Sequence, residues 1–252
     1  MIVAMDTSTA LTSVAVVDGT RVIAQRSELD PRRHAEVLAP LLLAVLDEAG
    51  VGAADVTTIA CGVGPGPYTG LRVAIASARA LGLAWVRPVA GLCSLDAVAA
   101  AVVAGGVEAP FGVAFDARRR EVYWAWFDAA GERLVGPQVT RPEEIDPRLR
   151  SGAWAGHGAV DHAADFVATV SGDHAVLYPE AEWVARRVHR LLSSGVQVER
   201  PGIELSTHGD AGTGTSDALA GLRLLPPEPL YLRRPDAAEV RPAPPHLPRA
   251  TS

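Results

Sequence analysis

The loop Asp6-Thr7-Ser8-Thr9 carries the densest set of chemically active side chains near the start of the chain. It follows a short apolar stretch, residues 1–5, which is typical of a buried β-strand. One carboxylate and three hydroxyls at a strand end can hold phosphate oxygens and a metal-bound water. The same side chains also bond their own backbone in ordinary turns, so the residues alone leave both interpretations open.

A second acidic residue, Asp116, ends another apolar stretch and is followed by Arg118, Arg119 and Arg120. Asp6 and Asp116 facing each other across a cleft would suit an ATP-dependent phosphotransferase, which is one alternative function. No neighbouring residue stands out as a base for the acceptor hydroxyl. The arginines could neutralise Asp116 or touch RNA phosphates, although short arginine runs in an acidic protein are usually solvated.

Other catalytic patterns find little support. The glycine- and proline-rich stretch at 61–70, CGVGPGPYTG, matches neither phosphate-binding glycine motif, and Pro65 and Pro67 lack the N–H groups that a phosphate cradle needs. We expect it to be a rigid turn. All 23 basic residues are arginine, which excludes every lysine-dependent mechanism. No two histidines lie four apart, and two cysteines are too few for a zinc site, so we expect no metal site and no catalytic residues.

Composition places the chain among globular proteins of one or two domains. Its 252 residues can bury a substantial core, and a net charge of −6 gives no general attraction for nucleic acid. Cys61 and Cys93 form no disulfide framework, which favours a reducing compartment. No signal peptide or membrane-spanning run is recognisable, so we expect a cytoplasmic protein with no membrane partner.

Two segments of the N-terminal half are predicted to be unusually apolar helices, at 33–49 and from Thr69 to residue 84. The second has four very small residues spaced four apart, which form a strip along one face: Gly70, Ala74, Ala78 and Gly82. A surface helix normally keeps one charged face. These helices must therefore be covered on several sides, either by this chain or by a partner.

The strand pattern repeats along the chain. Asp6 and Asp18 are twelve residues apart, as are Asp116 and Asp128, and each pair marks the ends of two successive predicted strands. This predicts two α/β lobes with mixed sheets, at 1–107 and 108–236. In the second lobe we expect helices at 159–170 and 181–193, strands at 175–178 and 228–236, and a mobile insertion at 201–220. The proline-rich stretch 237–252 is predicted to be a disordered tail.

Four segments together resemble the bacterial TsaB family, also called YeaZ: MIVAMDTS, GVGPGPYTGLRVAIASARALG, DARRREVYWA and PLYLRRPDA. The resemblance covers about half of the chain, and the glycine–proline turn with its helix is its most specific part. It implies a fold of the actin, sugar-kinase and Hsp70 (ASKHA) type, with two ribonuclease-H-like lobes. That fold agrees with the repeat.

The resemblance also implies a function. Such proteins are non-catalytic scaffolds or activators that pair with a catalytic relative, TsaD, and with a small ATPase, TsaE. Together these transfer a threonylcarbamoyl group to the adenosine beside the anticodon of certain tRNAs. We therefore expect tRNA contact only through the complex, a homodimer when TsaD is absent, and at most weak or vestigial ATP or ADP binding at the Asp6 loop. TsaD carries a metal-binding His-x-x-x-His motif, whereas His34 is followed four residues later by Leu38. This departure also argues against a metallopeptidase, an old label of the family.

The partner contact is implied to involve both apolar helices and the turn before the second. The corresponding residues are His34, Leu38 and Leu42 on the first helix, Gly64, Pro65, Gly66, Pro67, Tyr68, Thr69, Gly70 and Arg72 around the turn, and Ala76, Arg79 and Ala80 on the second helix. The alternative is that these helices only pack on their own sheet.

Overall fold

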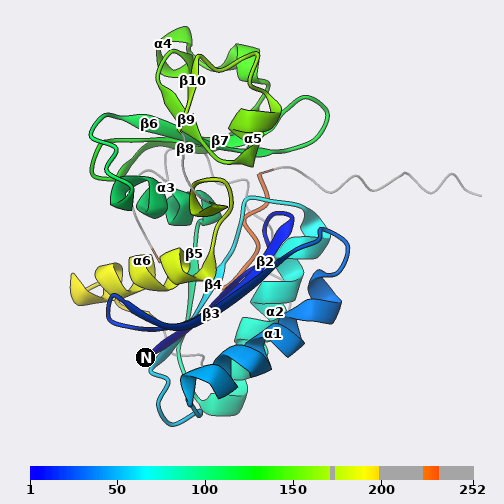
Figure 1. Cartoon of the computed structure of the whole chain (residues 1–252), viewed down its shortest axis with the longest axis vertical. Helices are drawn as coiled ribbons and strands as arrows, with labels where there is room; N and C mark the ends of the chain where they lie inside the picture. The colour runs from blue at the N-terminus through cyan, green and yellow to red at the C-terminus, as the bar shows by residue number, and fades with distance from the viewer. Residues whose placement is uncertain (171–173, 199–223, 233–252) are drawn as a thin grey trace, which may run out of the picture.

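The computed structural model describes residues 1–170, 174–198 and 224–232 as two lobes, each built on a five-stranded sheet (Figure 1). The N-terminal sheet has the strand order β3-β2-β1-β4-β5. Its strands are β1 (Ile2–Asp6), β2 (Leu11–Asp18), β3 (Arg21–Leu29), β4 (Thr58–Gly62) and β5 (Val89–Leu92). The first three strands are antiparallel neighbours, whereas β4 and β5 run parallel to β1.

The C-terminal sheet repeats this plan. Its strands are β6 (Phe111–Asp116), β7 (Val122–Phe127), β8 (Arg133–Thr140), β9 (Ala153–Ala155) and β10 (Ala168–Thr169), in the order β8-β7-β6-β9-β10. Here too the first three strands are antiparallel, and the last two are parallel to the first. The matching orders confirm the internal repeat predicted from the sequence, and they agree with the two ribonuclease-H-like lobes that the family resemblance implies.

Helices cover both faces of the N-terminal sheet. Two of them, α1 (His34–Ala49) and α2 (Tyr68–Trp85), lie side by side on one face, and α6 (Ala181–Ser193) covers the other (Figure 1). Strand β1 serves both faces because its side chains alternate. Val3 and Met5 join the core under α1 and α2, while Ile2 and Ala4 join the core under α6.

The lobes share their helices across the predicted boundary at residue 107. Helix α3 (Ser94–Ala104), before the boundary, packs on the C-terminal sheet, whereas α6, after it, packs on the N-terminal sheet. An ion pair joins α3 to β8, with Arg133 Nη2 3.0 Å from Asp96 Oδ2 and both side chains buried. The boundary stays a prediction, since each side contributes a helix to the other core.

Several predicted elements differ from the structure. Helix α2 begins at Tyr68, one residue before the predicted start, with Pro67 as its N-cap residue at φ −60° and ψ 136°. Helix α5 (His157–Asp161) ends early, and the predicted strand at 175–178 is instead the 3-10 turn η2 (His174–Val176). The short elements α4 (Pro147–Arg150) and η1 (Pro142–Glu144) complete the lobe.

The C-terminal segment described, 224–232, forms no strand at the predicted position. It makes one isolated bridge, between Leu225 and Gly91, and the backbone N–H of Leu230 donates to the carbonyl of Val63. The predicted insertion at 201–220 and tail at 237–252 lie outside the described residues. Among the residues that are described, no helix is long and apolar enough to cross a membrane.

Candidate functional site

The Asp6 carboxylate is enclosed at the end of β1. Its Oδ1 accepts hydrogen bonds from the backbone N–H and the hydroxyl of Ser8, both at 2.7 Å, and its Oδ2 accepts one from the Ser94 hydroxyl at 2.7 Å. The same Ser94 hydroxyl accepts a bond from the backbone N–H of Gly64. Asp6 therefore ties β1 to α3 and to the glycine–proline turn.

Thr7 holds the first turns of α2. Its hydroxyl donates to the carbonyl of Gly70 at 2.7 Å and accepts from the backbone N–H of Ala74 at 3.1 Å. The backbones of the turn and of the Asp6 loop are also packed closely together. A Cβ added at Gly66 would lie 2.0 Å from the carbonyl oxygen of Ser8, and a Cβ added at Gly70 would lie 2.6 Å from the carbonyl oxygen of Thr7. The glycines thus allow the turn to lie directly on the Asp6 loop and set the position of α2.

Only two of the four residues in the predicted nucleotide loop, 6–9, are placed where they could contact a ligand. Ser8 and Thr9 line a pocket between the lobes, whereas Asp6 and Thr7 are fully buried and do not line it. Asp116 does line this pocket. A phosphotransferase that uses Asp6 and Asp116 together would need Asp6 to leave its buried hydrogen bonds, so the geometry does not favour that alternative.

Burial of Asp6 has a consequence that depends on pH. Loss of hydration raises the pKa of this carboxyl from 3.8 to about 6, although hydrogen bonds from Ser8 and Ser94 oppose the rise. The folded state then holds a proton that the unfolded state has already lost, so stability falls as pH rises from about 4 to 6. Relative to an Asp6→Asn variant, we expect the wild type to lose about 3 kcal/mol of unfolding free energy over this window. Urea unfolding of both proteins from pH 4 to 7 tests this, and parallel curves would contradict it.

The outer surface of α1 does not use the residues predicted for partner contact. His34, Leu38 and Leu42 are 8%, 2% and 8% exposed and face inward, with His34 Nδ1 2.7 Å from the Thr12 hydroxyl. Leu38 and Leu42 belong to the core under the helix. The exposed apolar stripe consists instead of Ala35, Ala39 and Leu43, spaced four apart.

Helix α2 does expose the predicted residues. Arg72, Ala76, Arg79 and Ala80 all lie on its outer side, and Leu83 extends the stripe with 62% of its surface exposed. The small residues Gly70, Ala74, Ala78 and Gly82 are buried, which places them on the face toward the sheet. Gly64 and Pro65 are also buried, behind the exposed Pro67, Tyr68 and Thr69.

We name the exposed surface of the two helices the helix-pair face, defined by Ala35, Ala39 and Leu43 of α1 and Arg72, Ala76, Arg79, Ala80 and Leu83 of α2. A hollow on this face lies between the helices, bordered by Ala35 on one side and by Tyr68, Arg72 and Ala76 on the other. Its walls are mostly small or apolar, and this geometry suits a partner side chain or helix more than a charged ligand.

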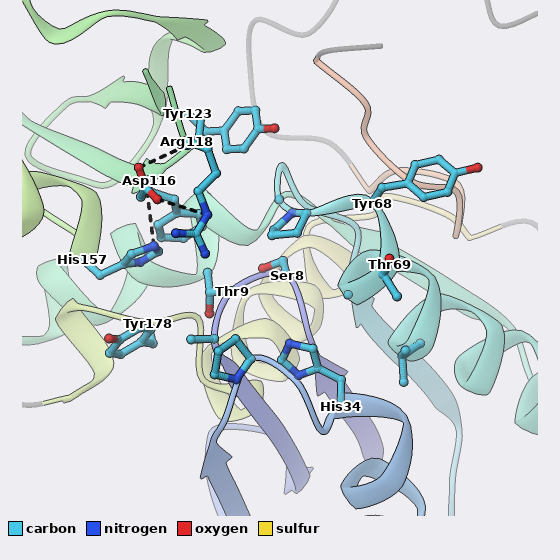
Figure 2. Close-up of a pocket in the computed structure, with 18 of the residues that line it drawn as sticks. Ser8, Thr9, His34, Tyr68, Thr69, Asp116, Arg118, Tyr123, His157 and Tyr178 are labelled. Carbon is cyan, nitrogen blue, oxygen red and sulfur yellow. Dashed lines mark hydrogen bonds and ion pairs between the residues drawn. The ribbon is translucent and has the colours of Figure 1, made fainter. Parts of the chain in front are cut away.

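The second feature is the interlobe pocket, with a volume of about 550 Å³ (Figure 2). Ser8, Thr9 and His34 reach it from the N-terminal lobe, and Asp116, Arg118, His157 and Tyr178 reach it from the C-terminal lobe. Asp116 contacts Arg118 and His162, at 3.6 Å and 3.7 Å. Burial lowers the pKa of His157, so its ring is neutral near pH 7. No cluster of three His, Cys, Asp or Glu side chains suited to a metal occurs in the described part of the chain.

A family model described as "TsaD: tRNA N6-adenosine threonylcarbamoyltransferase" matches residues 23–193. The Escherichia coli tRNA threonylcarbamoyladenosine biosynthesis protein TsaB is 32% identical over 72% of this chain and 82% of its own length. The chain belongs to the TsaB family. The resemblance of the four sequence segments is thereby confirmed.

Two further proteins are similar to this chain. An uncharacterised protein of Mycobacterium tuberculosis is 42% identical over 66% of this chain and 75% of its own length. YeaZ from Pseudomonas aeruginosa superimposes with a TM-score of 0.66 and 30% identity, covering 77% of this chain and 92% of that structure. The two-lobed architecture is therefore that of the TsaB family.

Proposed function

We propose that this chain is a supporting subunit in tRNA threonylcarbamoyladenosine biosynthesis and binds a TsaD-like catalytic subunit through the helix-pair face. The observation that carries the proposal is the exposed apolar surface of α1 and α2, where Leu43 is 68% and Leu83 62% exposed. Alanines between these leucines allow another helix to approach closely. Two helices of this length can supply an interface of about 800 Å² on each partner.

A TsaD-like subunit is the occupant that the similarity favours. The chain itself matches the family model described as TsaD, so the two proteins share a fold over most of this chain. Related subunits can pair through equivalent elements across an approximate two-fold axis. The same geometry lets a second copy of this chain occupy the face when the TsaD-like subunit is absent, and a TsaE-like ATPase then joins the heterodimer.

The bond-making step is assigned to the TsaD-like subunit. In this chain Asp6, Thr7 and Ser94 hold α2 and the glycine–proline turn in place through buried hydrogen bonds. Only Ser8 and Thr9 of the loop face the interlobe pocket. We propose that any ATP or ADP binds there weakly, since the loop's carboxylate is turned away.

Analytical ultracentrifugation of the full chain tests the assembly. Alone, the chain is expected to shift from monomer to dimer as its concentration rises. With an equimolar TsaD-like subunit it is expected to form a heterodimer at concentrations where the homodimer has dissociated. A chain that stays monomeric in both experiments would contradict the proposal.

A further inference from the structure

The interlobe pocket has the composition of a recognition site rather than of ordinary surface. The protein has four tyrosines, and all four line this pocket: Tyr68, Tyr123, Tyr178 and Tyr231. They come from α2, β7, the segment after η2 and the C-terminal segment, so the fold gathers residues that are far apart in sequence. Tyrosine presents a large, rigid ring together with a polar hydroxyl, and it is enriched where proteins bind other molecules.

Arginines border the same pocket. Arg118 and Arg119 line it from the β6–β7 turn, and Arg32 lines it from the approach to α1. The turn holds Arg118, Arg119 and Arg120 in the left-handed region, with φ of 63°, 55° and 64°. This conformation is unfavourable for residues other than glycine, and such strain gathers at functional sites. Figure 2 shows the Arg118 side chain directed into the pocket, towards Thr9 on the other lobe.

One wall of the pocket is a column of flat rings. Phe115 and Tyr178 stack on opposite sides of His157, with both ring-centre distances at 5.2 Å and interplanar angles of 17° and 10°. His157 Nε2 accepts the backbone N–H of Asp116, so this nitrogen carries no proton. His157 Nδ1 is buried without a hydrogen-bond partner among the described residues. The ring of His174 lies on Tyr178 as well, with ring centres 4.8 Å apart and an interplanar angle of 34°. The column therefore presents ring edges, not an open ring face, beside the guanidinium groups.

The charges favour an anion, but only modestly. Three guanidinium groups line the pocket against two carboxylates, those of Asp116 and Asp161, whereas the whole chain has a net charge of −6. Asp116 also accepts the backbone N–H of Arg118, so it shapes the turn. The Arg118 side chain remains 81% exposed and can reach a ligand phosphate.

The pocket lacks the parts that hold a nucleoside triphosphate. Gly66 is packed against the Ser8 carbonyl, and Asp6, the acid of this loop, lies outside the pocket. Separate arginines beside stacked rings instead match the way proteins bind unpaired RNA, where bases stack on aromatic side chains and guanidinium groups meet backbone phosphates.

We propose that the interlobe pocket binds an unpaired nucleotide of the tRNA, with its base against the tyrosine-lined wall and an adjacent phosphate at Arg118. This inference rests on the proposed function for the identity of the RNA. It assigns the chain a direct contact with tRNA, in addition to any contact made through the complex.

Binding of a labelled anticodon stem-loop to the full chain, measured by fluorescence anisotropy at several salt concentrations, tests the proposal. Arg118→Gln is expected to weaken binding by about threefold to tenfold and to reduce the slope of log K against log salt by about 0.7, the loss of one phosphate contact. Arg148→Gln is the matched control. Arg148 is also exposed and paired with a nearby aspartate, but it lies on α4 at the far end of the C-terminal lobe (Figure 1). It should leave both quantities unchanged.

Variants of Tyr178 test the aromatic wall of the pocket. Tyr178→Ala is expected to weaken stem-loop binding by about threefold to tenfold, because it removes an aromatic edge that lines the pocket and can pack against the base. Tyr178→Phe keeps the ring and should bind like the wild type. No binding by the wild type, equal binding of a fully paired duplex, or wild-type affinity in both Arg118→Gln and Tyr178→Ala would overturn the proposal. Displacement of the stem-loop by AMP or ATP would also overturn it if the free nucleotide bound as tightly as the stem-loop does, because the site would then be a site for a free nucleotide.

Different results would contradict the docking of the TsaD-like subunit and the binding of RNA in the interlobe pocket. Arg118 and Tyr178 lie outside the helix-pair face, so their variants should still bind the TsaD-like subunit. If the wild-type chain binds the stem-loop but not that subunit, the docking proposal fails and the RNA site stands.

Discussion

Replacing Ala76 with glutamate is expected to weaken binding of the TsaD-like subunit by about a hundredfold or more, because a buried unpaired charge is costly in an interface. Ala76 lies in the middle of the helix-pair face and borders its hollow. Its side chain is exposed in the isolated chain, so the variant should fold and melt like the wild type. Isothermal titration calorimetry measures the affinity, and thermal unfolding checks the fold.

The matched control is Ala44→Glu on α1. Ala44 is also an exposed helical alanine, but it is nine residues from Ala35, which places it half a turn around the helix at 100° per residue. It points away from α2, so the glutamate should leave the affinity within about twofold of the wild type. Equal affinities for Ala76→Glu and Ala44→Glu would show that the partner binds another surface.

The second large effect is expected for Gly66→Ala. The added Cβ would lie 2.0 Å from the carbonyl oxygen of Ser8, which is backbone and cannot move without shifting the Asp6 loop. We expect the free energy of unfolding to fall by about 3 kcal/mol or more, as for severe overpacking. Chemical denaturation measures this loss. Since the turn also sets the start of α2, affinity for the TsaD-like subunit should fall in the molecules that remain folded.

Gly52→Ala is the control for this change. A Cβ there would meet only the Asp55 carboxylate, at 3.7 Å, which is ordinary van der Waals contact. The substitution should alter stability by no more than about 0.5 kcal/mol. If Gly66→Ala were as stable as Gly52→Ala, the close packing of the turn on the Asp6 loop would be wrong.

Much of the architecture could be predicted because its signals are local. The spacing from Asp6 to Asp18 recurs from Asp116 to Asp128, and the structure shows the same strand order in both sheets. Helix α6 was predicted with its observed bounds because its buried residues, such as Val184 and Val188, alternate at helical spacing with polar ones.

The orientation of α1 could not be predicted, because the sequence of this helix carries no local signal for it. The helix is apolar on nearly every side, so no polar stripe distinguishes the surface facing the sheet from the surface facing outward. Leu38 and Leu43 look equivalent in the sequence, yet they are 2% and 68% exposed. Only the placement of the helix on β2 and β3 decides between them.

The role of the Asp6 loop depends on partners that are distant in sequence. Thr7 bonds Gly70, which is 63 residues away, and Asp6 bonds Ser94, which is 88 residues away. A turn that binds phosphate and a turn that anchors a helix use the same residue types. The predicted helix at 159–170 failed for a related reason, because the chain leaves α5 after Asp161 to add the edge strand β10 beside β9.

Reconstituted tRNA modification tests whether the chain acts through the helix-pair face. The TsaD-like and TsaE-like subunits, tRNA and the activated threonylcarbamoyl donor are combined with no added chain, with the wild type or with Ala76→Glu. We expect full modification with the wild type, a rate near background without it, and the same background with Ala76→Glu. Normal modification with Ala76→Glu or without the chain would contradict a function exerted through the helix-pair face.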